Sequence, residues 1–273
     1  MRAMPSSRSL FAFVLLLLSL VPQARAEVSK SVFLEELTWT ELRDRVAAGS
    51  TTVIVPVGGT EQSGPQIALG KHNARAHALA GRIAVALGHV LVAPVIAYVP
   101  EGSIDPPAGH MRFPGTISVP TAAFETTLEY AARSLRHAGF RDIVLIGDHG
   151  GYQRSLVKVA AKLNREWAGG AARVHAVEEY YRAVDVDYVQ ALKRQGFRDD
   201  EIGSHAGLAD TSLTLALAPQ LVRSERLHDG AKLGVADGVH GDPRRSSAAA
   251  GQAGVDLIVR RTSEAIRKDV AHR

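Results

Sequence analysis

Three apolar runs rich in β-branched residues place the strongest limit on how this chain can fold. They occupy residues 52–57 (TVIVPV), 89–99 (HVLVAPVIAYV) and 142–146 (DIVLI). A run that is apolar on both faces is typical of a strand buried inside a parallel sheet. Segments with the apolar spacing of helices lie between the runs, at residues 74–87 and 121–138. This alternation predicts an α/β fold with a mainly parallel central sheet and helices on both of its faces.

The N-terminus has the pattern of a secretory leader. Arg2 and Arg8 precede an apolar segment at residues 10–21, and an A-x-A motif ends at Ala26. We expect a signal peptide at residues 1–26, cleavage after Ala26, and a periplasmic or secreted protein without stable membrane insertion. An uncleaved membrane anchor is the alternative, but an apolar core of about a dozen residues is short for a bilayer span.

The remaining 247 of the 273 residues suit one domain, so we expect a single domain at residues 27–273. The leader contains three arginines and no acid, and its removal lowers the formal net charge from +4 to +1. A nearly neutral protein lacks the positive surface that binding to nucleic acid requires. The sequence has no cysteine, so any metal must be held by histidine and carboxylate side chains.

The first run ends at Gly58-Gly59, and the loop that follows presents Glu61, Ser63, Lys71 and His72. Glycine allows a sharp turn or a close approach of the backbone to a ligand. A buried strand that delivers polar side chains into a loop is a common way to build a site in an α/β protein. An ordinary turn with solvated polar residues would have the same sequence pattern, so both interpretations stay open for this stretch alone.

Five of the eleven histidines share one sequence context, glycine-rich turns at the ends of predicted elements. They are His72, His110, His149, His205 and His240. Open α/β sheets build their sites at the carboxyl ends of parallel strands, so this shared context favours a functional cluster. For the other six histidines we expect ordinary surface or core positions.

Glu61, His72 and His149 form the strongest candidate trio. One glutamate and two histidines can hold a catalytic divalent metal and leave a position open for water. Such a metal polarises a carbonyl group and lowers the pKa of bound water. In the alternative interpretation, His149 caps a helix and Glu61 is a surface acid.

Five motifs occur in order along most of the chain: VPVGGTEQSGPQIALGKHN, MRFPGTISVP, GDHGGYQ, HAGLADTSLTLALAP and GVHGDP. Together they resemble the motifs of the creatininase (creatinine amidohydrolase) family. The resemblance implies a three-layer α/β/α sandwich with a divalent metal at the strand ends. It also implies hydrolysis of amide-type C–N bonds and assembly into homo-oligomers, often hexamers.

The resemblance also assigns roles to individual residues. Glu61 and His149 match metal ligands of the family, and His205 matches a histidine that assists catalysis. Asp210 stands where the family has a site glutamate, so we predict that His205 and Asp210 are catalytic residues.

Four positions of this chain depart from the family pattern. Ser63 stands where the family has a histidine ligand, and His72 stands at the aspartate that bridges two metals. Gln66 replaces a second histidine of the loop, and Gly151 replaces an acid found in creatininase itself. A two-metal centre needs several carboxylates to offset two dications, so these changes favour a smaller site.

We therefore predict a mononuclear metal site with Glu61, His72 and His149 as ligands and Asp210 as a candidate fourth ligand. Zinc is the first expectation for this set of nitrogen and oxygen donors, and manganese or iron could also bind. The predicted partners are a small amide substrate, cyclic or linear, and further copies of the chain in a homo-oligomer. A non-catalytic binding or scaffold protein on the same fold is the alternative function.

Residues near this predicted site have open roles. Asp148 could orient an imidazole ring or cap the helix that follows it. The long loop at residues 100–120 contains Glu101, Asp105 and His110, which are candidates for substrate contact or for a lid. For Glu101 and Asp105 we expect simple turn chemistry.

Overall fold

The computed structural model describes residues 30–228 and 233–271. The predicted signal peptide and its cleavage site lie outside the described residues. Within the described ranges, no helix is both long enough and apolar enough to cross a membrane.

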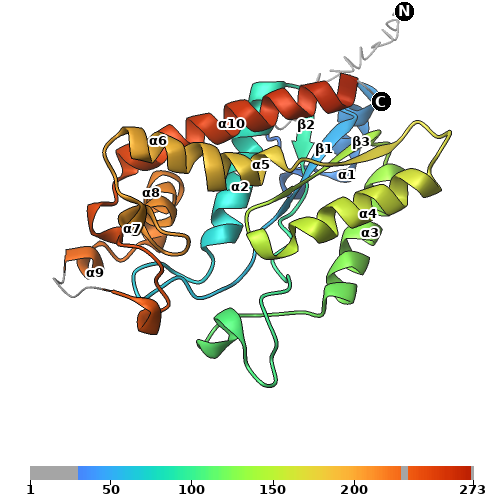
Figure 1. Cartoon of the computed structure of the whole chain (residues 1–273). Coiled ribbons are helices and arrows are strands. Elements are labelled where there is room, and N and C mark those ends of the chain that lie inside the picture. The colour runs from blue at the N-terminus through green and yellow to red at the C-terminus, as the bar shows by residue number, and fades with distance from the viewer. Residues whose placement is uncertain (1–29, 229–232, 272–273) are drawn as a thin grey trace, which may run out of the picture.

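A four-stranded, all-parallel sheet forms the middle layer in the order β2-β1-β3-β4 (Figure 1). Its strands are β1 (Thr52–Val57), β2 (Val90–Val92), β3 (Asp142–Gly147) and β4 (Arg173–Ala176). The parallel sheet confirms the predicted fold class. The expected strand at residues 89–99 is wrong in length, because the regular spacing of N–H groups that donate to β1 ends at Ala93 and resumes only at Ile96, three residues later. Ile96 rejoins β1 only through an isolated bridge to Val57.

Three helices cover one face of the sheet: α1 (Trp39–Ala47), α3 (Thr121–His137) and α4 (Gln153–Glu166). Alternate residues of β1 point toward this layer, where Val53 and Val55 pack with Phe124 of α3 and Leu156 of α4. All four side chains are almost completely buried. The alternation therefore anchors the sheet to this layer through every second residue.

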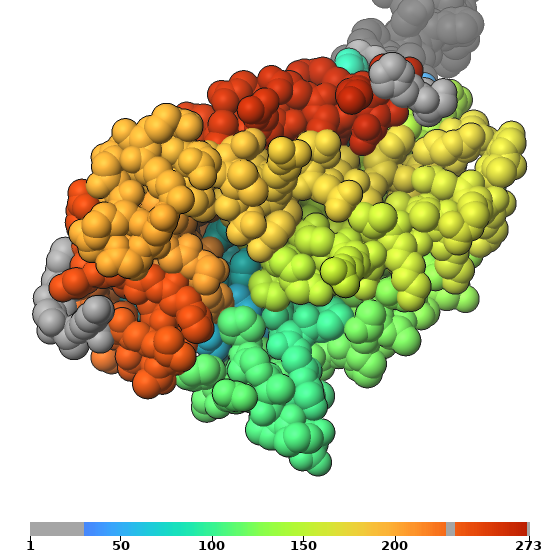
Figure 2. All heavy atoms as spheres, in the orientation of Figure 1, coloured from blue at the N-terminus to red at the C-terminus, as the bar shows by residue number. Residues whose placement is uncertain are grey.

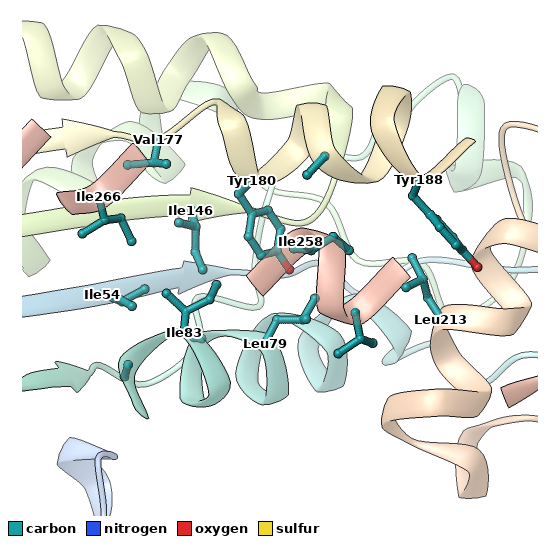
Figure 3. Packing of buried hydrophobic residues seen from close by; sticks show 14 of the residues in the cluster. Ile54, Leu79, Ile83, Ile146, Val177, Tyr180, Tyr188, Leu213, Ile258 and Ile266 are labelled. Carbon is teal, nitrogen blue, oxygen red and sulfur yellow. The ribbon is translucent and has the colours of Figure 1, made fainter. Parts of the chain in front are cut away.

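The opposite face carries the other α-helices (Figure 1). They are α2 (Lys71–Leu87), α5 (Glu179–Arg182), a π-helical turn (Ala183–Tyr188), α6 (Val189–Arg194), α8 (Leu208–Leu217) and α10 (Ala248–Ala271), with the short α7 (Asp199–Ile202) and α9 (Ser224–His228) beside them. In Figure 3, Ile54 of β1 lies against Leu79 and Ile83 of α2, and Ile258 of α10 closes the same cluster. The two helical layers and the sheet form the expected three-layer α/β/α sandwich.

Helix α2 begins earlier than the expected start at residue 74. It starts at Lys71, after Gly70, which has no side chain to serve as a cap. Lys71, His72 and Arg75 are all buried in its first turns. His72 is therefore a helical residue and not a loop residue, and its position relative to Lys71 and Arg75 is fixed by the helix.

The strand order creates the crevice in which the site lies. From β1 the chain crosses to β2 on one side, and it later returns to β3 on the other side of β1. The chain segments that follow β1 and β3 therefore run to opposite sides and leave a crevice between them at the carboxyl ends of these strands. Doubly wound sheets bind their ligands in such a crevice. The last paired residues at this edge are Val57 and Gly147.

Candidate metal centre

A cavity of about 350 Å³ opens at the carboxyl ends of β1 and β3. In Figure 2 it is the hollow between the orange segment, the yellow-green β3–α4 turn and the green β2–α3 loop, with blue atoms on its floor. Charged and imidazole side chains line it, among them Lys71, His72, Arg75, His110, His149, His205, Asp210 and His240. All five histidines predicted to cluster therefore line one cavity.

The carboxylate of Glu61, completely buried, lies beneath this cavity, and its two oxygens have different surroundings. Oε1 lies 2.7 Å from Nε2 of His72 and 3.5 Å from Nζ of Lys71. Oε2 has no hydrogen-bond partner among the described residues. It faces Nε2 of His110 at 3.2 Å and Nε2 of His149 at 3.5 Å. Burial tends to raise the pKa of Glu61, but Lys71 and His72 outweigh it and hold this pKa well below its usual range.

His72 is held between two carboxylates. Its Nδ1 lies 2.6 Å from Oδ2 of Asp148, and its Nε2 contacts Glu61. Burial and Lys71 work to lower the pKa of His72, but the two carboxylates raise it above its ordinary value. Of the two roles predicted for Asp148, the contact with His72 therefore supports the first, which is to orient an imidazole ring. The cap of the next turn is His149, whose Nδ1 accepts a hydrogen bond from the N–H of Gly151 at 3.2 Å.

A network of buried charges surrounds this pair. Nη1 of Arg75 lies 2.7 Å from Oδ1 of Asp210, and Nζ of Lys71 lies 2.9 Å from Oδ2 of the same carboxylate. Arg75 also pairs through Nε with Oδ2 of Asp148 at 3.2 Å. The hydroxyl of Tyr180 donates to Oδ1 of Asp148 at 2.7 Å. Despite burial, which works in the opposite direction, the cations keep the pKa values of Asp148 and Asp210 below their ordinary range.

The two predicted catalytic residues lie on one turn of the chain. Nε2 of His205 lies 3.0 Å from the carbonyl oxygen of Gln62, and Nδ1 lies 3.7 Å from Oε1 of Glu61. Asp210 accepts a hydrogen bond from the N–H of Ala206 at 2.8 Å, and Ala206 has a positive φ of 53°. Asp210 therefore fixes the turn that carries His205. The catalytic roles of both residues stay predictions.

Glu101 is a site residue for which the sequence favoured the wrong role. The expectation of turn chemistry is wrong for this residue, because its side chain is completely buried and points toward His149. Oε2 of Glu101 lies 3.6 Å from Nε2 of His149, and burial together with the charge of Glu61 raises the pKa of Glu101 to about 8. Asp105, in the same loop, is exposed. No local signal distinguishes the two acids, since only the fold brings one of them to the sheet edge.

The residues present fit a single divalent metal. Glu61, His72 and His149 offer ligand atoms within 4.8 Å of one another, as do Glu61, His110 and His205. Burial and the charge of His72 lower the pKa of His149 to about 4, which leaves the ring neutral and able to bind a cation through nitrogen. Buried carboxylate oxygens without partners in the described chain belong to Glu61 and Glu101, and such oxygens indicate a cation site. A divalent metal is thus supported by the donor set itself.

Comparisons with known proteins agree with this geometry. The family model described as creatinine amidohydrolase matches residues 35–266. The creatinine amidohydrolase of Pseudomonas putida is 35% identical over 207 residues, which cover 74% of this chain and 78% of that protein. A mycofactocin precursor peptide peptidase of Mycolicibacterium smegmatis is 29% identical over 221 residues, covering 73% and 78% of the two chains.

Solved structures give the same result. Two creatininase structures, one of a mutant described as the Zn-Zn type and the other described as the Mn enzyme, each align with a TM-score of 0.72 and 30% identity. Each alignment covers 88% of this chain and 99% of the creatininase chain. Because the family model spans most of the sequence and the structures share its fold, this chain belongs to the creatininase family of amidohydrolases and is a hydrolase of amide-type C–N bonds.

Proposed function

We propose that the protein is a zinc-dependent amidohydrolase with one metal ion per subunit, and that it acts on a small amide outside the cytoplasm. The observation that carries the proposal is the free oxygen of the buried Glu61 carboxylate, which faces the imidazoles of His110 and His149. Nitrogen and oxygen donors of this kind suit zinc, and they also accept manganese or iron. Ser63 and Gly151 supply neither imidazole nor carboxylate, which supports one metal and not two.

A divalent cation held at this position would polarise an amide carbonyl and would activate water for attack on it. Glu61 supplies negative charge to the cation and is itself held by Lys71 and His72. His205 donates its Nε2–H to the carbonyl oxygen of Gln62, and this leaves Nδ1 to take the proton released by the attacking water and deliver it to the departing nitrogen. Asp210 acts as a positioning residue, because it holds the turn that carries His205.

The cavity supports a small substrate. Its volume of about 350 Å³ lies near the lower end of the range for small-molecule pockets. One relative is named for creatinine and another for a precursor peptide. A compact cyclic amide or the end of a short peptide therefore fits both the cavity and the chemistry.

The proposed amidohydrolase function is tested by comparing metal-free and zinc-loaded protein on a panel of amides. The purified protein, stripped with a chelator and reloaded with one equivalent of zinc, is offered cyclic amides and short peptides. We expect hydrolysis of at least one compound by the reloaded protein and none by the stripped protein, with release of an amine or amino acid as the readout. Fully loaded protein that binds a panel compound but hydrolyses none would support the non-catalytic alternative instead.

We also propose export and self-association. The leader pattern that ends at Ala26 supports export, and the resemblance to creatininases supports a homo-oligomer, with a hexamer as the leading candidate. N-terminal sequencing of the exported protein is expected to begin at Glu27, and sedimentation is expected to give a mass several times that of one chain. An intact leader on the exported protein, or a monomer at micromolar concentration, would contradict the respective half of this proposal.

A further inference from the structure

Glu101 has a buried carboxyl group that receives no hydrogen bond from a donor in the described chain, and its neighbour Glu61 is a second acid. Its side chain is completely buried, and neither Oε1 nor Oε2 has a hydrogen-bond partner among the residues that the structure describes. Burying a polar group without a partner is costly, and a buried carboxylate is costlier still. A cation between this carboxylate and its neighbours would remove that cost.

The backbone beside Glu101 leaves room for the carboxylate. A Cβ atom at Gly59 would lie only 2.6 Å from Oε1 of Glu101 and 3.2 Å from a methyl group of Val99. Gly59 has a φ of 153°, a conformation that a residue with a side chain rarely adopts. Glycine at this position therefore serves both the turn after β1 and the placement of Glu101.

The spacing of donor atoms distinguishes ligands from hydrogen-bond partners. Zinc bonds of 2.0–2.1 Å in a tetrahedral arrangement separate neighbouring ligand atoms by about 3.3 Å. Oε2 of Glu61 lies 3.5 Å from Nε2 of His149, and that nitrogen lies 3.6 Å from Oε2 of Glu101. The contact between His72 and Glu61, at 2.7 Å, is instead a hydrogen-bond length. The two contacts of Nε2 of His149, with Glu61 and with Glu101, thus have the separation of neighbouring ligands around one ion.

The chain just before Glu101 passes close to Gly151, the position at which creatininase has an acid. A Cβ atom at Gly151 would lie 3.8 Å from the carbonyl oxygen of Pro100, the residue before Glu101. The β3–α4 turn and the start of the β2–α3 loop are therefore adjacent at this point. Glu101 of the β2–α3 loop can therefore supply a negative charge that the β3–α4 turn, with glycine at position 151, does not supply.

We propose that Glu101 is a carboxylate ligand of the metal, together with Glu61 and His149, in the place predicted from the sequence for His72. His72 instead neutralises the other oxygen of Glu61 and is held there by Asp148. Nε2 of His110 lies 3.2 Å from the same Oε2 of Glu61. This assignment rests on the metal of the proposed function, but it concerns binding and not turnover.

Zinc affinity of the stripped protein tests the assignment without any substrate. Zinc is titrated against a chromophoric competitor chelator for the wild type, Glu101→Gln, Glu101→Asp and the control Asp105→Asn. The control removes one charge from an exposed position of the same loop. We expect Glu101→Gln to weaken zinc binding by at least about a hundredfold, more than the loss of an outer-shell partner causes. Glu101→Asp should bind with intermediate affinity, and Asp105→Asn like the wild type.

Melting of the same proteins with and without zinc separates a ligand from a merely structural residue. Stripped Glu101→Gln should melt no lower than the stripped wild type, since it loses an unpaired buried acid, but zinc should no longer raise its melting temperature. Wild-type zinc affinity in Glu101→Gln would overturn the assignment. If Glu101→Gln fails to fold, wild-type zinc affinity in Glu101→Asp would overturn the assignment instead. A protein that binds zinc through Glu101 and hydrolyses no amide would sink the proposed function and leave the assignment intact.

Discussion

Replacing Arg75 with methionine is expected to lower the free energy of unfolding by about 3–5 kcal/mol, the usual cost of removing one partner from a buried ion pair. Arg75 is 1% exposed and pairs with Asp210 and Asp148. Burial lowers the pKa of Arg75, but these two carboxylates outweigh it and raise the pKa above its ordinary value. Without the guanidinium, both acids stay buried next to fewer cations, so the folded state loses stability.

Urea unfolding of the metal-free protein measures this effect. Arg82→Met is the matched control, because Arg82 lies on the same helix and is exposed; its unfolding midpoint should stay close to that of the wild type. Adding Asp210→Asn to Arg75→Met should cost less than the sum of the single changes, since it removes an acid that has lost its partner. Equal losses of stability in Arg75→Met and Arg82→Met would show that the buried network contributes little.

The second large effect is expected at Glu61. Replacing it with glutamine keeps the shape of the side chain but removes the charge that faces His110 and His149. We expect bound metal to fall from one ion per chain to almost none, and hydrolysis to fall by more than about a hundredfold. Elemental analysis of the dialysed protein and initial rates on the best amide of the panel measure the two effects.

Glu179→Gln serves as the control for this change, because Glu179 is exposed on α5. It should retain both metal and activity. Circular dichroism of Glu61→Gln checks that the fold is intact, since Lys71 and His72 lose a charged partner in this variant. Retention of a full equivalent of metal by folded Glu61→Gln would exclude Glu61 as a ligand.

The sequence predicts the sheet well where a run is apolar on both faces, because such a run fits only a strand buried inside a parallel sheet. Residues 52–57 and 142–146 are apolar throughout most of their length, and they form β1 and most of β3. The prediction for the third run fails beyond Val92 because the alternate spacing of donors to β1 is broken between Ala93 and Ile96, around Pro94. The start of α2 is missed because its first turn is held by buried ion pairs and not by a capping side chain.

The residues of the candidate site also fall into two groups, those that the sequence predicts and those that only the fold brings to the site. Glu61 and His149 can be found from the sequence because both follow strands whose carboxyl ends meet at the same edge of the sheet. Lys71 and Arg75 look like surface charges of a helix rich in alanine and leucine. Their burial is possible because acids from other parts of the fold pair with them. Asp210 of α8 pairs with both, and Asp148, directly after β3, pairs with Arg75. Glu101 is beyond local reasoning for the same reason, since its neighbours come from other loops.

The loop between β2 and α3 has a consequence for how this protein could change over time. This single stretch carries both Glu101, which lies near His149, and His110, which lies near the free oxygen of Glu61, and it forms a wall of the cavity (Figure 2). Surface loops accept insertion and exchange more readily than strands. A swap of residues 100–120 between relatives would therefore alter metal preference and substrate range in one step. The sheet, with Glu61 and His149 in the turns that follow its strands, would stay the same and would support new amidase activities.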